Sequence, residues 1–490
     1  MEPREFYLRG QLTACIRETE HSLAAQDRIL RAQAFIRLAR YRDALAVVAD
    51  VGGTTPEEKA LLAALESSCH SFQGSPAMAR RVLLGIPRQM WSEETQFEIG
   101  YARMLLAWME DAPDAMDHAL HEVEVGPESH IYGRWLYARS WVAALRGDFG
   151  EQLKLLEQAI EHIAETPAAY DVTLLASATR SLVHLLREIS APATFEFGVR
   201  MAESIPWTED LEYERFLTFR GLAWAYALRG LHEKAFHYAY FARDIAPSVM
   251  WVTACYADQA YLARMAGENR SADALLRHAV ACAQETDWTS PGEERVAILN
   301  LIELVADRDL AAANRLLNIY DGIPVTLAPR LALARDRRLH AMEEYARGNV
   351  LAASGDRAAA VGLLSSAYAM FSSINYAWRA AAAALRLHAM TDDNAWLARA
   401  SEAVTDFSES SVARDIRRKA AGAEDPRFAT LTPAQRRVFE MICEGLTDKQ
   451  IAQNLQISPD TVKNHAARVR VAFGVHSRAA LIAAIHRKAV

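Results

Sequence analysis

A pattern of small residues at fixed spacing recurs along most of this 490-residue chain and restricts its fold more than any other feature. In the clearest copy, RGLAWAYALRGLHEKAFHYAYFARDIAP at 220–247, Ala223 is followed at offsets of 7, 12, 19 and 24 residues by Gly, Ala, Ala and Pro. Two antiparallel helices approach closely only where side chains are small. Glycine accepts the left-handed backbone that ends the first helix, and proline stops the second. The pattern therefore predicts a helical hairpin.

Further copies of the pattern lie on both sides of the first. Offsets of 7, 12 and 19 recur from Ala260 and from Gly348, and partial copies begin at Ser140, Ser67 and Ala32. Each hairpin leaves an apolar face that only a neighbouring hairpin can cover, so the copies predict a stacked array. An irregular bundle of α-hairpins, with small residues placed by chance, is the alternative.

The repeated pattern resembles the tetratricopeptide repeat (TPR) over about residues 25–410. Low Gly and Pro contents (22 and 16 residues) also favour helix over a turn-rich β fold. We therefore expect residues 1–420 to form an all-α, TPR-like α-hairpin solenoid. The resemblance implies a region that binds a protein, a peptide or a small-molecule effector. Several aromatic side chains could line a groove there, although we favour a place in the core between hairpins: Trp207, Trp224, Tyr226, Tyr238, Tyr240, Trp251 and Tyr256.

The last part of the chain has a different pattern. Residues 421–430 contain a proline and interrupt the helical periodicity, which predicts a linker. Three helices are expected after it: one following the N-cap Thr432, a short one over about Asp448–Leu455, and a longer one following the N-cap Ser458. A short helix, a tight turn and a longer helix make up a helix-turn-helix.

The third of these helices has two contrasting faces. Its apolar stripe recurs at steps of 4, 3 and 4 residues through Val462, Ala466, Val469 and Phe473. The opposite face carries Lys463, Asn464, Ala467, Arg468 and Arg470. Lys and Asn can hydrogen-bond base edges in the major groove, whereas arginines and Lys449 suit phosphates. The helix is therefore a candidate recognition helix.

Charge separates the same two regions. Residues 431–490 carry nine Lys or Arg and four acidic residues, although the whole chain has a net charge of −8. A basic end on an acidic remainder suggests that the end contacts nucleic acid.

The segment Leu431–Arg478 resembles the LuxR/FixJ-type (GerE-like) DNA-binding domain. The matching motifs are LTP at 431–433, GLTDKQIA at 445–452, ISPDTVKNH at 457–465 and GVxSR at 474–478. The resemblance implies a small four-helix domain over residues 431–490 that binds double-stranded DNA.

The same resemblance implies roles for individual residues. Lys463 and Asn464 would face bases, while Lys449, Thr461 and His465 would set the helix on the DNA backbone. The full candidate set for DNA contact is Lys449, Ser458, Thr461, Lys463, Asn464, His465, Ala467, Arg468 and Arg470. A last helix over about 477–487 would carry a homodimer contact through Leu481, Ile482 and Ile485.

The segment departs from the family pattern at several positions. Ala434 and Gln435 replace an Arg-Glu pair, Gln456 replaces a glycine, and Ala472 replaces a basic residue. The first change removes an ion pair expected within the domain, and the last removes a phosphate contact. The alternative is a three-helix module that binds protein rather than DNA.

Other protein classes lack support in the sequence. The dipeptide GK of a phosphate-binding loop does not occur, and no spacing suggests a nucleophile with its base, so we expect no enzyme and no cofactor. His118 and His121 in an acidic stretch could bind a metal, but a solvated acidic helix face is favoured, and no metal is expected. Five dispersed cysteines and no run of about 18 apolar residues predict a cytoplasmic protein outside the membrane.

These features together predict a sequence-specific, dimeric transcriptional regulator whose helical repeats bind a regulatory partner or effector. A TPR-type interaction scaffold with weak, non-specific DNA contact is the alternative. A small-molecule sensor with a pocket among the repeats is a third possibility.

Overall fold

The computed structural model describes the chain except for residues 50–53, 88, 111, 124, 188, 190, 287, 289–293, 324–336, 425–429, 444, 479 and 482–490. The described part contains helices and turns and no strand, which confirms the predicted all-α fold class.

Most of the described chain is a succession of helices joined by short turns. The first are α1 (Pro3–Leu8), α2 (Leu12–Thr19), α3 (Ala25–Arg37), α4 (Tyr41–Val48), α5 (Pro56–Phe72), α6 (Pro76–Leu84), α7 (Glu93–Met109), α8 (Pro113–His121), α9 (Tyr132–Arg146), α10 (Phe149–Glu165), α11 (Val172–Leu185) and α12 (Pro192–Ser204). Next come η1 (Glu209–Leu211), α13 (Glu212–Leu228), α14 (His232–Asp244), α15 (Val249–Met265), α16 (Asn269–Glu285), α17 (Glu294–Val305), α18 (Leu310–Gly322), α20 (Arg337–Ser354), α21 (Arg357–Ser373), α22 (Ala377–Thr391) and α23 (Asn394–Ala403). The remainder are η2 (Thr405–Phe407), α24 (Ser411–Glu424), α26 (Pro433–Cys443), α27 (Asp448–Leu455) and α28 (Pro459–Phe473).

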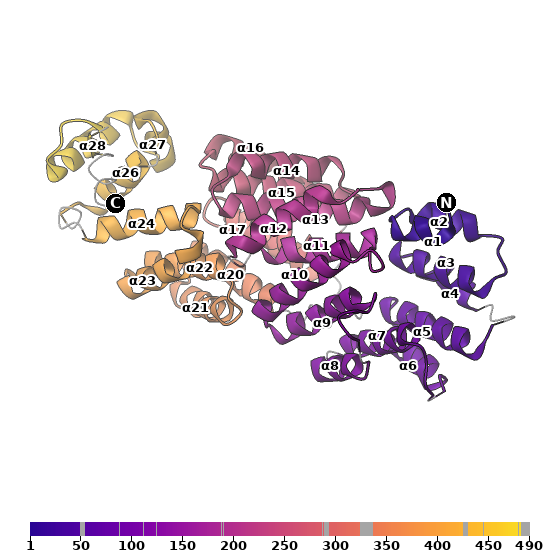
Figure 1. Cartoon of the computed structure of the whole chain (residues 1–490). Helices are drawn as coiled ribbons and strands as arrows, with labels where there is room; N and C mark the ends of the chain where they lie inside the picture. The colour runs from indigo at the N-terminus through magenta and orange to yellow at the C-terminus, as the bar shows by residue number, and fades with distance from the viewer. Residues whose placement is uncertain are drawn as a thin grey trace.

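Consecutive helices from α1 to α23 pack as hairpins that stack into a TPR-like solenoid (Figure 1). The glycines predicted to end the first helix of a hairpin have φ between 74° and 92°: Gly74, Gly147, Gly230, Gly267 and Gly355. In the copy that begins at Ala32, Ala39 occupies this position with φ 55°. The left-handed conformation costs about 1 kcal/mol more for alanine than for glycine.

The small residues of the pattern lie where the two helices of a hairpin meet. Ala223, Ala235 and Ala242 are each 1% exposed. A Cβ atom at Gly348 would lie 2.8 Å from Cγ of Leu364. A larger side chain at any of these positions would therefore push the hairpin apart.

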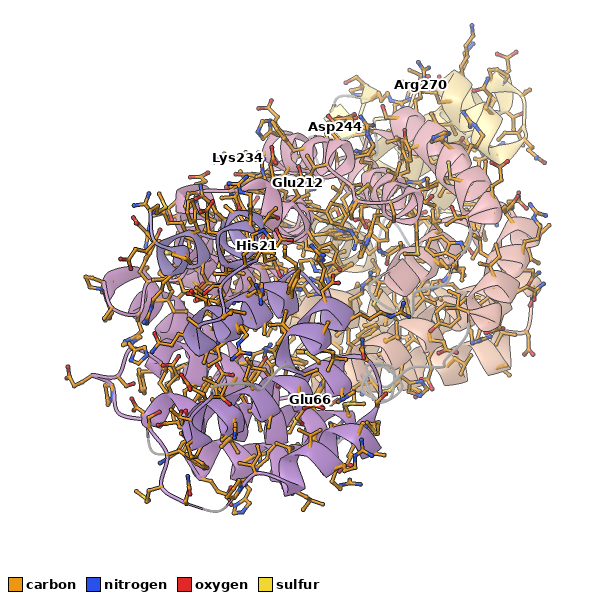
Figure 2. All side chains as sticks on the ribbon, turned by 90° about the vertical axis from the view of Figure 1, so that its right-hand side faces the viewer. His21, Glu66, Glu212, Lys234, Asp244 and Arg270 are labelled. Atoms are coloured by element: carbon orange, nitrogen blue, oxygen red, sulfur yellow. The ribbon has the colours of Figure 1, made fainter. Side chains whose placement is uncertain are left out.

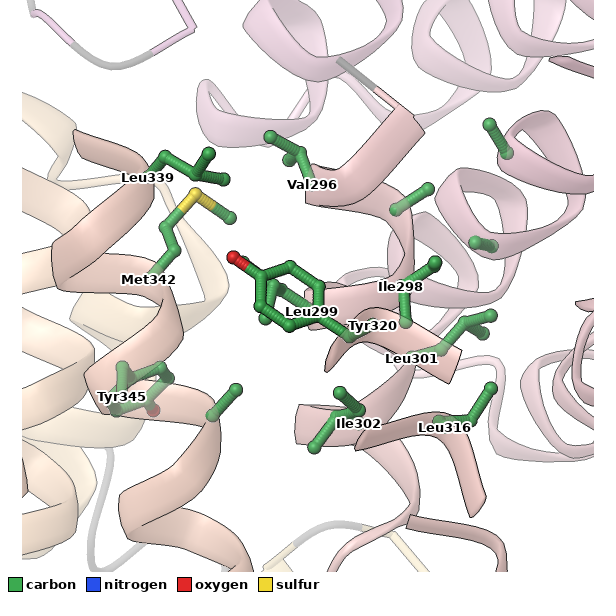
Figure 3. Packing of buried hydrophobic residues seen from close by; sticks show 14 of the residues in the cluster. Val296, Ile298, Leu299, Leu301, Ile302, Leu316, Tyr320, Leu339, Met342 and Tyr345 are labelled. Atoms are coloured by element: carbon green, nitrogen blue, oxygen red, sulfur yellow. The ribbon is translucent and has the colours of Figure 1, made fainter. Parts of the chain in front are cut away.

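The core runs from hairpin to hairpin through the array. In the close-up of α17, α18 and α20, Tyr320 lies among Leu299, Leu339 and Met342 (Figure 3). The Tyr320 hydroxyl donates to Glu343 at 3.2 Å, so the polar end of the ring is satisfied at the edge of this core.

The aromatic residues singled out in the sequence mostly contribute to this core. Trp224, Tyr226 and Trp251 are at most 5% exposed, as favoured, whereas Tyr240 is 45% exposed. The remaining three are partly buried: Trp207, Tyr238 and Tyr256.

The N-terminal hairpins pack back on the middle of the array. The Arg37 guanidinium donates to both oxygens of Asp171 at 2.6 Å. Thr13 donates to Asp210 from its backbone nitrogen at 2.9 Å and from its hydroxyl at 2.5 Å. These bonds join residues far apart in sequence, so the first superhelical turn closes on itself. We call this contact, between α1–α3 and the segment that runs from Asp171 at the start of α11 to η1, the ring closure.

The end of the solenoid differs from the prediction in one respect. The linker was expected to begin at residue 421, but α24 continues to Glu424. Ala420, Ala421 and Ala423 favour helix, and the breaker Pro426 comes only later. The rest of the predicted linker, apart from Thr430, lies outside the described residues.

None of the described helices is long and apolar enough to cross a membrane.

Candidate nucleic-acid interface

The helix α26 begins with a reciprocal cap. The backbone nitrogen of Thr432 donates to Oε1 of Gln435 at 2.9 Å, and the Gln435 nitrogen donates to Oγ1 of Thr432 at 3.4 Å. Gln435 is one of the departures from the family pattern, and here its side chain satisfies a helix end instead of joining an ion pair.

The short helix α27 begins in the same way and ends under strain. Thr447 and Gln450 form a capping box, and Ile451 and Ala452 pack into the domain. The helix ends at Gln456, which has the left-handed φ of 53°. The family has glycine at this position, so glutamine costs about 1 kcal/mol here.

The longer helix α28 is fixed by its cap and by its apolar stripe. Oγ of Ser458 accepts a hydrogen bond from the Thr461 nitrogen at 3.0 Å. The predicted stripe is buried, and Phe473 stacks on Phe439 with ring centroids 4.9 Å apart. The predicted order of a first helix, a short helix and a longer helix is therefore confirmed. All three helices begin at the predicted residues, and the short helix also ends where predicted, at Leu455.

The side chains predicted to contact DNA lie on α27, on α28 and on the turn between them. Most are open to solvent: Lys449, Ser458, Lys463, Asn464 and Arg468 are exposed, and Thr461, His465, Ala467 and Arg470 are partly buried. His465 turns its Nδ1 atom inward, where it has no hydrogen-bond partner among the described residues. The helix α28 thus has a polar, mainly exposed face and, on its other side, an apolar face that packs into the domain.

An ion pair lies on this exposed face. The Lys463 ammonium is 3.1 Å from Oδ1 of Asp460, and the two side chains are 64% and 86% exposed. A pair so open to water contributes at most about 1 kcal/mol. A base or phosphate could therefore draw the ammonium away at little cost.

Two residues of the segment have structural features that its sequence motifs do not indicate: the contacts of Arg478 and the exposure of Val471. Arg478, the last residue of GVxSR, donates to Asp448 at 2.7 Å and to the Leu446 carbonyl, and so holds the start of α27. Val471 is 81% exposed on α28, seven residues after Asn464 and on its side of the helix. The exposure of Val471 could have been predicted from the sequence, because this apolar residue lies outside the periodic stripe that packs into the core.

The predicted dimer contact needs correction at one residue. Leu481 is fully buried within its own domain, in a cluster with Leu431, Val438 and Val469. Its side chain therefore fills the domain core and is not available to a second subunit. Ile482 and Ile485 lie outside the described residues.

The acidic stretch with two histidines forms ion pairs. Arg146 binds Asp114 at 2.9 Å and Asp117 at 3.1 Å, and Glu122 lies 2.6 Å from Arg103. Among the described residues, no group of three possible ligands could hold a metal ion.

Comparison with known proteins identifies the C-terminal segment. Residues 429–485 match the family described as "Bacterial regulatory proteins, luxR family". Curated proteins of Mycobacterium tuberculosis (strain H37Rv) and Mycobacterium bovis, named as HTH-type transcriptional regulators, are each 40% identical over 55 residues. These alignments cover 11% of this chain and 6% of the relatives, so the chain matches only a small part of their length. The segment is a LuxR-family helix-turn-helix domain.

Solved structures resemble the chain over a longer range but less closely. The apo form of the quorum sensor NprR from B. thuringiensis is 12% identical, with a TM-score of 0.43 over 72% of this chain and 97% of that chain. A human IFIT1 dimer with m7Gppp-AAAA is 14% identical, with a TM-score of 0.43 over 87% of this chain and 96% of that chain. The repeat fold described above rests on the chain's own hairpins.

Proposed function

We propose that this chain is a sequence-specific DNA-binding transcriptional regulator. The observation that carries the proposal is the two-faced helix α28. Its apolar face packs into a separate domain core, while Lys463, Asn464 and Arg468 are exposed on the other side. A helix presented in this way fits the major groove.

The residues of the domain have different parts in the proposed complex. Lys463 donates to guanine O6 and N7, and Asn464 pairs with an adenine edge. The backbone contacts come from Lys449, from Ser458 and Thr461 at the N-terminus of α28, and from His465. Arg468 and Arg470 reach phosphates further along the groove, and the small Ala467 permits close approach.

The proposal extends to the remaining parts of the chain. Residues 1–420 form the sensor region and bind an effector or partner, residues 431–490 bind DNA, and the protein acts in the cytoplasm. A homodimer places two copies of α28 about 34 Å apart, one helical turn of DNA. Effector binding to the repeats then changes the geometry of the dimer or the exposure of α28.

The test is selection of genomic and random DNA fragments by the full-length protein across a salt series. We expect one short motif to be enriched, and we expect Lys463→Ala and Asn464→Ala to lose it. Lys449→Ala should weaken binding to all sequences alike and lower the salt dependence by about one unit. Lys154→Ala, at an exposed lysine of the solenoid, is the control and should change nothing.

The alternative is an interaction scaffold whose tail touches DNA weakly. The Asp460 carboxylate on the outer face of α28 and the missing basic residue at Ala472 favour it. Binding without any motif that disappears at moderate salt, together with tight capture of a protein by the repeats, would replace the regulator with the scaffold.

A further inference from the structure

The ring closure lies beside a partly open cavity in the first superhelical turn. The Thr208 hydroxyl donates to the Gly10 carbonyl at 2.7 Å, and a Cβ atom at Gly10 would lie 3.0 Å from Cδ1 of Leu211. In Figure 2, His21 after α2 and Glu212 at the start of α13 lie on the same side of the molecule. The first hairpin therefore contacts η1 and Thr208, the residue before it.

A cavity of about 670 Å³ lies behind this closure. Its wall is formed by α1, by one face of α3, and by residues at or just before the N-terminal ends of α5, α7, α9 and α11. Cavities of 300–1,000 Å³ are typical of sites for small ligands. The size therefore suits a small molecule or a peptide of a few residues, and excludes a folded partner.

The deepest charges of the cavity neutralise one another. Arg37 pairs with Asp171 at 2.6 Å, with the side chains 16% and 8% exposed. Arg134 pairs with Glu98 at 2.6 Å, with the side chains 25% and 4% exposed. Burial raises the pKa of the nearby Tyr7, which stays a neutral hydroxyl. This inner wall therefore adds no net charge.

The remaining charges of the cavity are mainly negative. Apart from these pairs, the lining contains one guanidinium, that of Arg4, one imidazole, that of His130, and five carboxylates, which belong to Glu2, Asp27, Glu57, Glu58 and Glu94. The N-termini of the helices at the cavity offset part of this charge, but the carboxylates remain in excess. The cavity therefore favours a cation.

The same wall also has an apolar part. Leu8, Ile29, Leu30, Leu61 and Ile131 line the cavity beside the carboxylates. Methylene groups are stabilised by such contacts, because burial removes them from water. A metal ion or a single ammonium would leave this part uncovered, whereas an alkyl chain with several amino groups covers it.

We propose that this cavity binds a linear aliphatic polyamine, whose ammonium groups meet the carboxylates while its methylene chain lies on the leucines and isoleucines. The inference rests on the proposed function, since it makes the cavity the effector site of the regulator. A short lysine peptide carries the same groups on a bulkier backbone, and the test separates the two.

The test is calorimetric titration of the full-length protein, without DNA, with spermidine, with trilysine and with citrate as the anionic control. We expect spermidine to bind at one site per chain, more tightly than trilysine, and citrate not to bind. Glu2 and Glu94 suit substitution because their side chains make no hydrogen bond or ion pair with the described residues. Glu2→Gln with Glu94→Gln should weaken spermidine binding at least tenfold and leave the melting temperature of the unliganded protein unchanged.

A matched pair of substitutions controls for general attraction to an acidic protein. Glu161→Gln with Glu233→Gln removes two exposed carboxylates outside the cavity and should leave spermidine binding unchanged. Equal loss in both pairs, or no saturable binding of spermidine, overturns the proposal. Preference for trilysine over spermidine overturns the polyamine in favour of a peptide. A DNA motif selected by a protein that ignores spermidine would leave the proposed function intact. If the protein binds spermidine but selects no DNA motif, the polyamine site stands and the proposed function as a regulator does not.

Discussion

The solenoid and the C-terminal domain keep their helices in place by different means. In the solenoid, some helices have a side-chain cap, such as α5 and α15, and others, such as α13 and α14, have none. The uncapped helices are held by neighbouring hairpins through small residues and a shared core. In the C-terminal domain, each of the three described helices has a side-chain cap, and the apolar cluster contains no described residue of the solenoid. A domain of about 60 residues buries little surface, so local bonds matter more to it.

Because of this difference, a destabilising substitution should affect neighbouring hairpins in the solenoid, whereas in the C-terminal domain its effect should stay within that domain. A hairpin of the solenoid loses its cover when its neighbour unfolds, whereas the C-terminal domain can melt as a unit. The following variants test the contrast through two separate transitions in calorimetry or hydrogen exchange.

The largest effect is expected at the buried ion pair between α13 and α15. Arg220 and Asp258 are each 4% exposed, with Nε and Oδ2 2.5 Å apart. Arg220→Ala should destabilise the solenoid by about 3–5 kcal/mol, because it leaves a buried carboxylate without its partner. Arg220→Met with Asp258→Leu should recover most of this loss. A lower melting temperature for the C-terminal domain in the single variant would contradict the separation.

A smaller effect is expected at the glycine between α13 and α14. Gly230 and Gly267 have φ of 74° and 81°, but only at Gly230 would a Cβ atom lie 2.9 Å from a backbone oxygen, that of Glu409. Gly267→Ala should cost about 1 kcal/mol through its backbone alone. Gly230→Ala should cost about 2–4 kcal/mol, because the clash adds to the same backbone penalty.

The position of Glu409 gives this comparison a second readout. Glu409 lies between η2 and α24, the helix that leads to the C-terminal domain. Gly230→Ala should therefore increase hydrogen exchange in residues 405–420, whereas Gly267→Ala should not. Equal exchange in the two variants would show that this segment is held by other contacts.

In the C-terminal domain, the test substitution removes a helix cap. Thr447→Ala removes the side chain that caps α27 and should destabilise this domain by about 1 kcal/mol. In a thermal melting experiment, this substitution should lower the transition temperature of that domain only. A shift in the solenoid transition would mean that the two regions share more of their stability than their cores indicate.

The smallest effects are gains, one in each region. Ala39→Gly in the solenoid and Gln456→Gly in the C-terminal domain place glycine at left-handed positions with φ of 55° and 53°. Each should raise stability by about 0.5–1 kcal/mol, since the strain relieved exceeds the entropy cost of glycine. Urea denaturation measures both, and a loss at either position would show that its side chain makes a contact that outweighs the strain.

The local part of this architecture could be predicted from the sequence. Glycine turns, small residues between helices and the three helix starts of the C-terminal domain all depend on neighbours within about 25 residues. The periodicity of α28 likewise predicted its buried stripe, because one apolar stripe on a helix faces one core.

The errors and omissions concern partners that the local pattern does not specify. Leu481 has the spacing of an apolar face, but spacing cannot distinguish a domain core from a subunit interface. Arg37 and Asp171 are ordinary charged residues in the sequence, and only the ring closure makes them a pair. The cavity and its carboxylates follow from that closure, so no local signal could have revealed them.

The ring closure also has a consequence for how the chain is made. Thr13 reaches its partner Asp210 only after 197 further residues have been added. At ribosomal rates of about 5–20 residues per second, the first hairpins wait about 10–40 s for the surface that covers them. During that time their inner apolar faces are exposed to other nascent chains and to chaperones. Slower translation upstream of α13 should therefore raise the yield of aggregated protein, although the sequence of the product is unchanged.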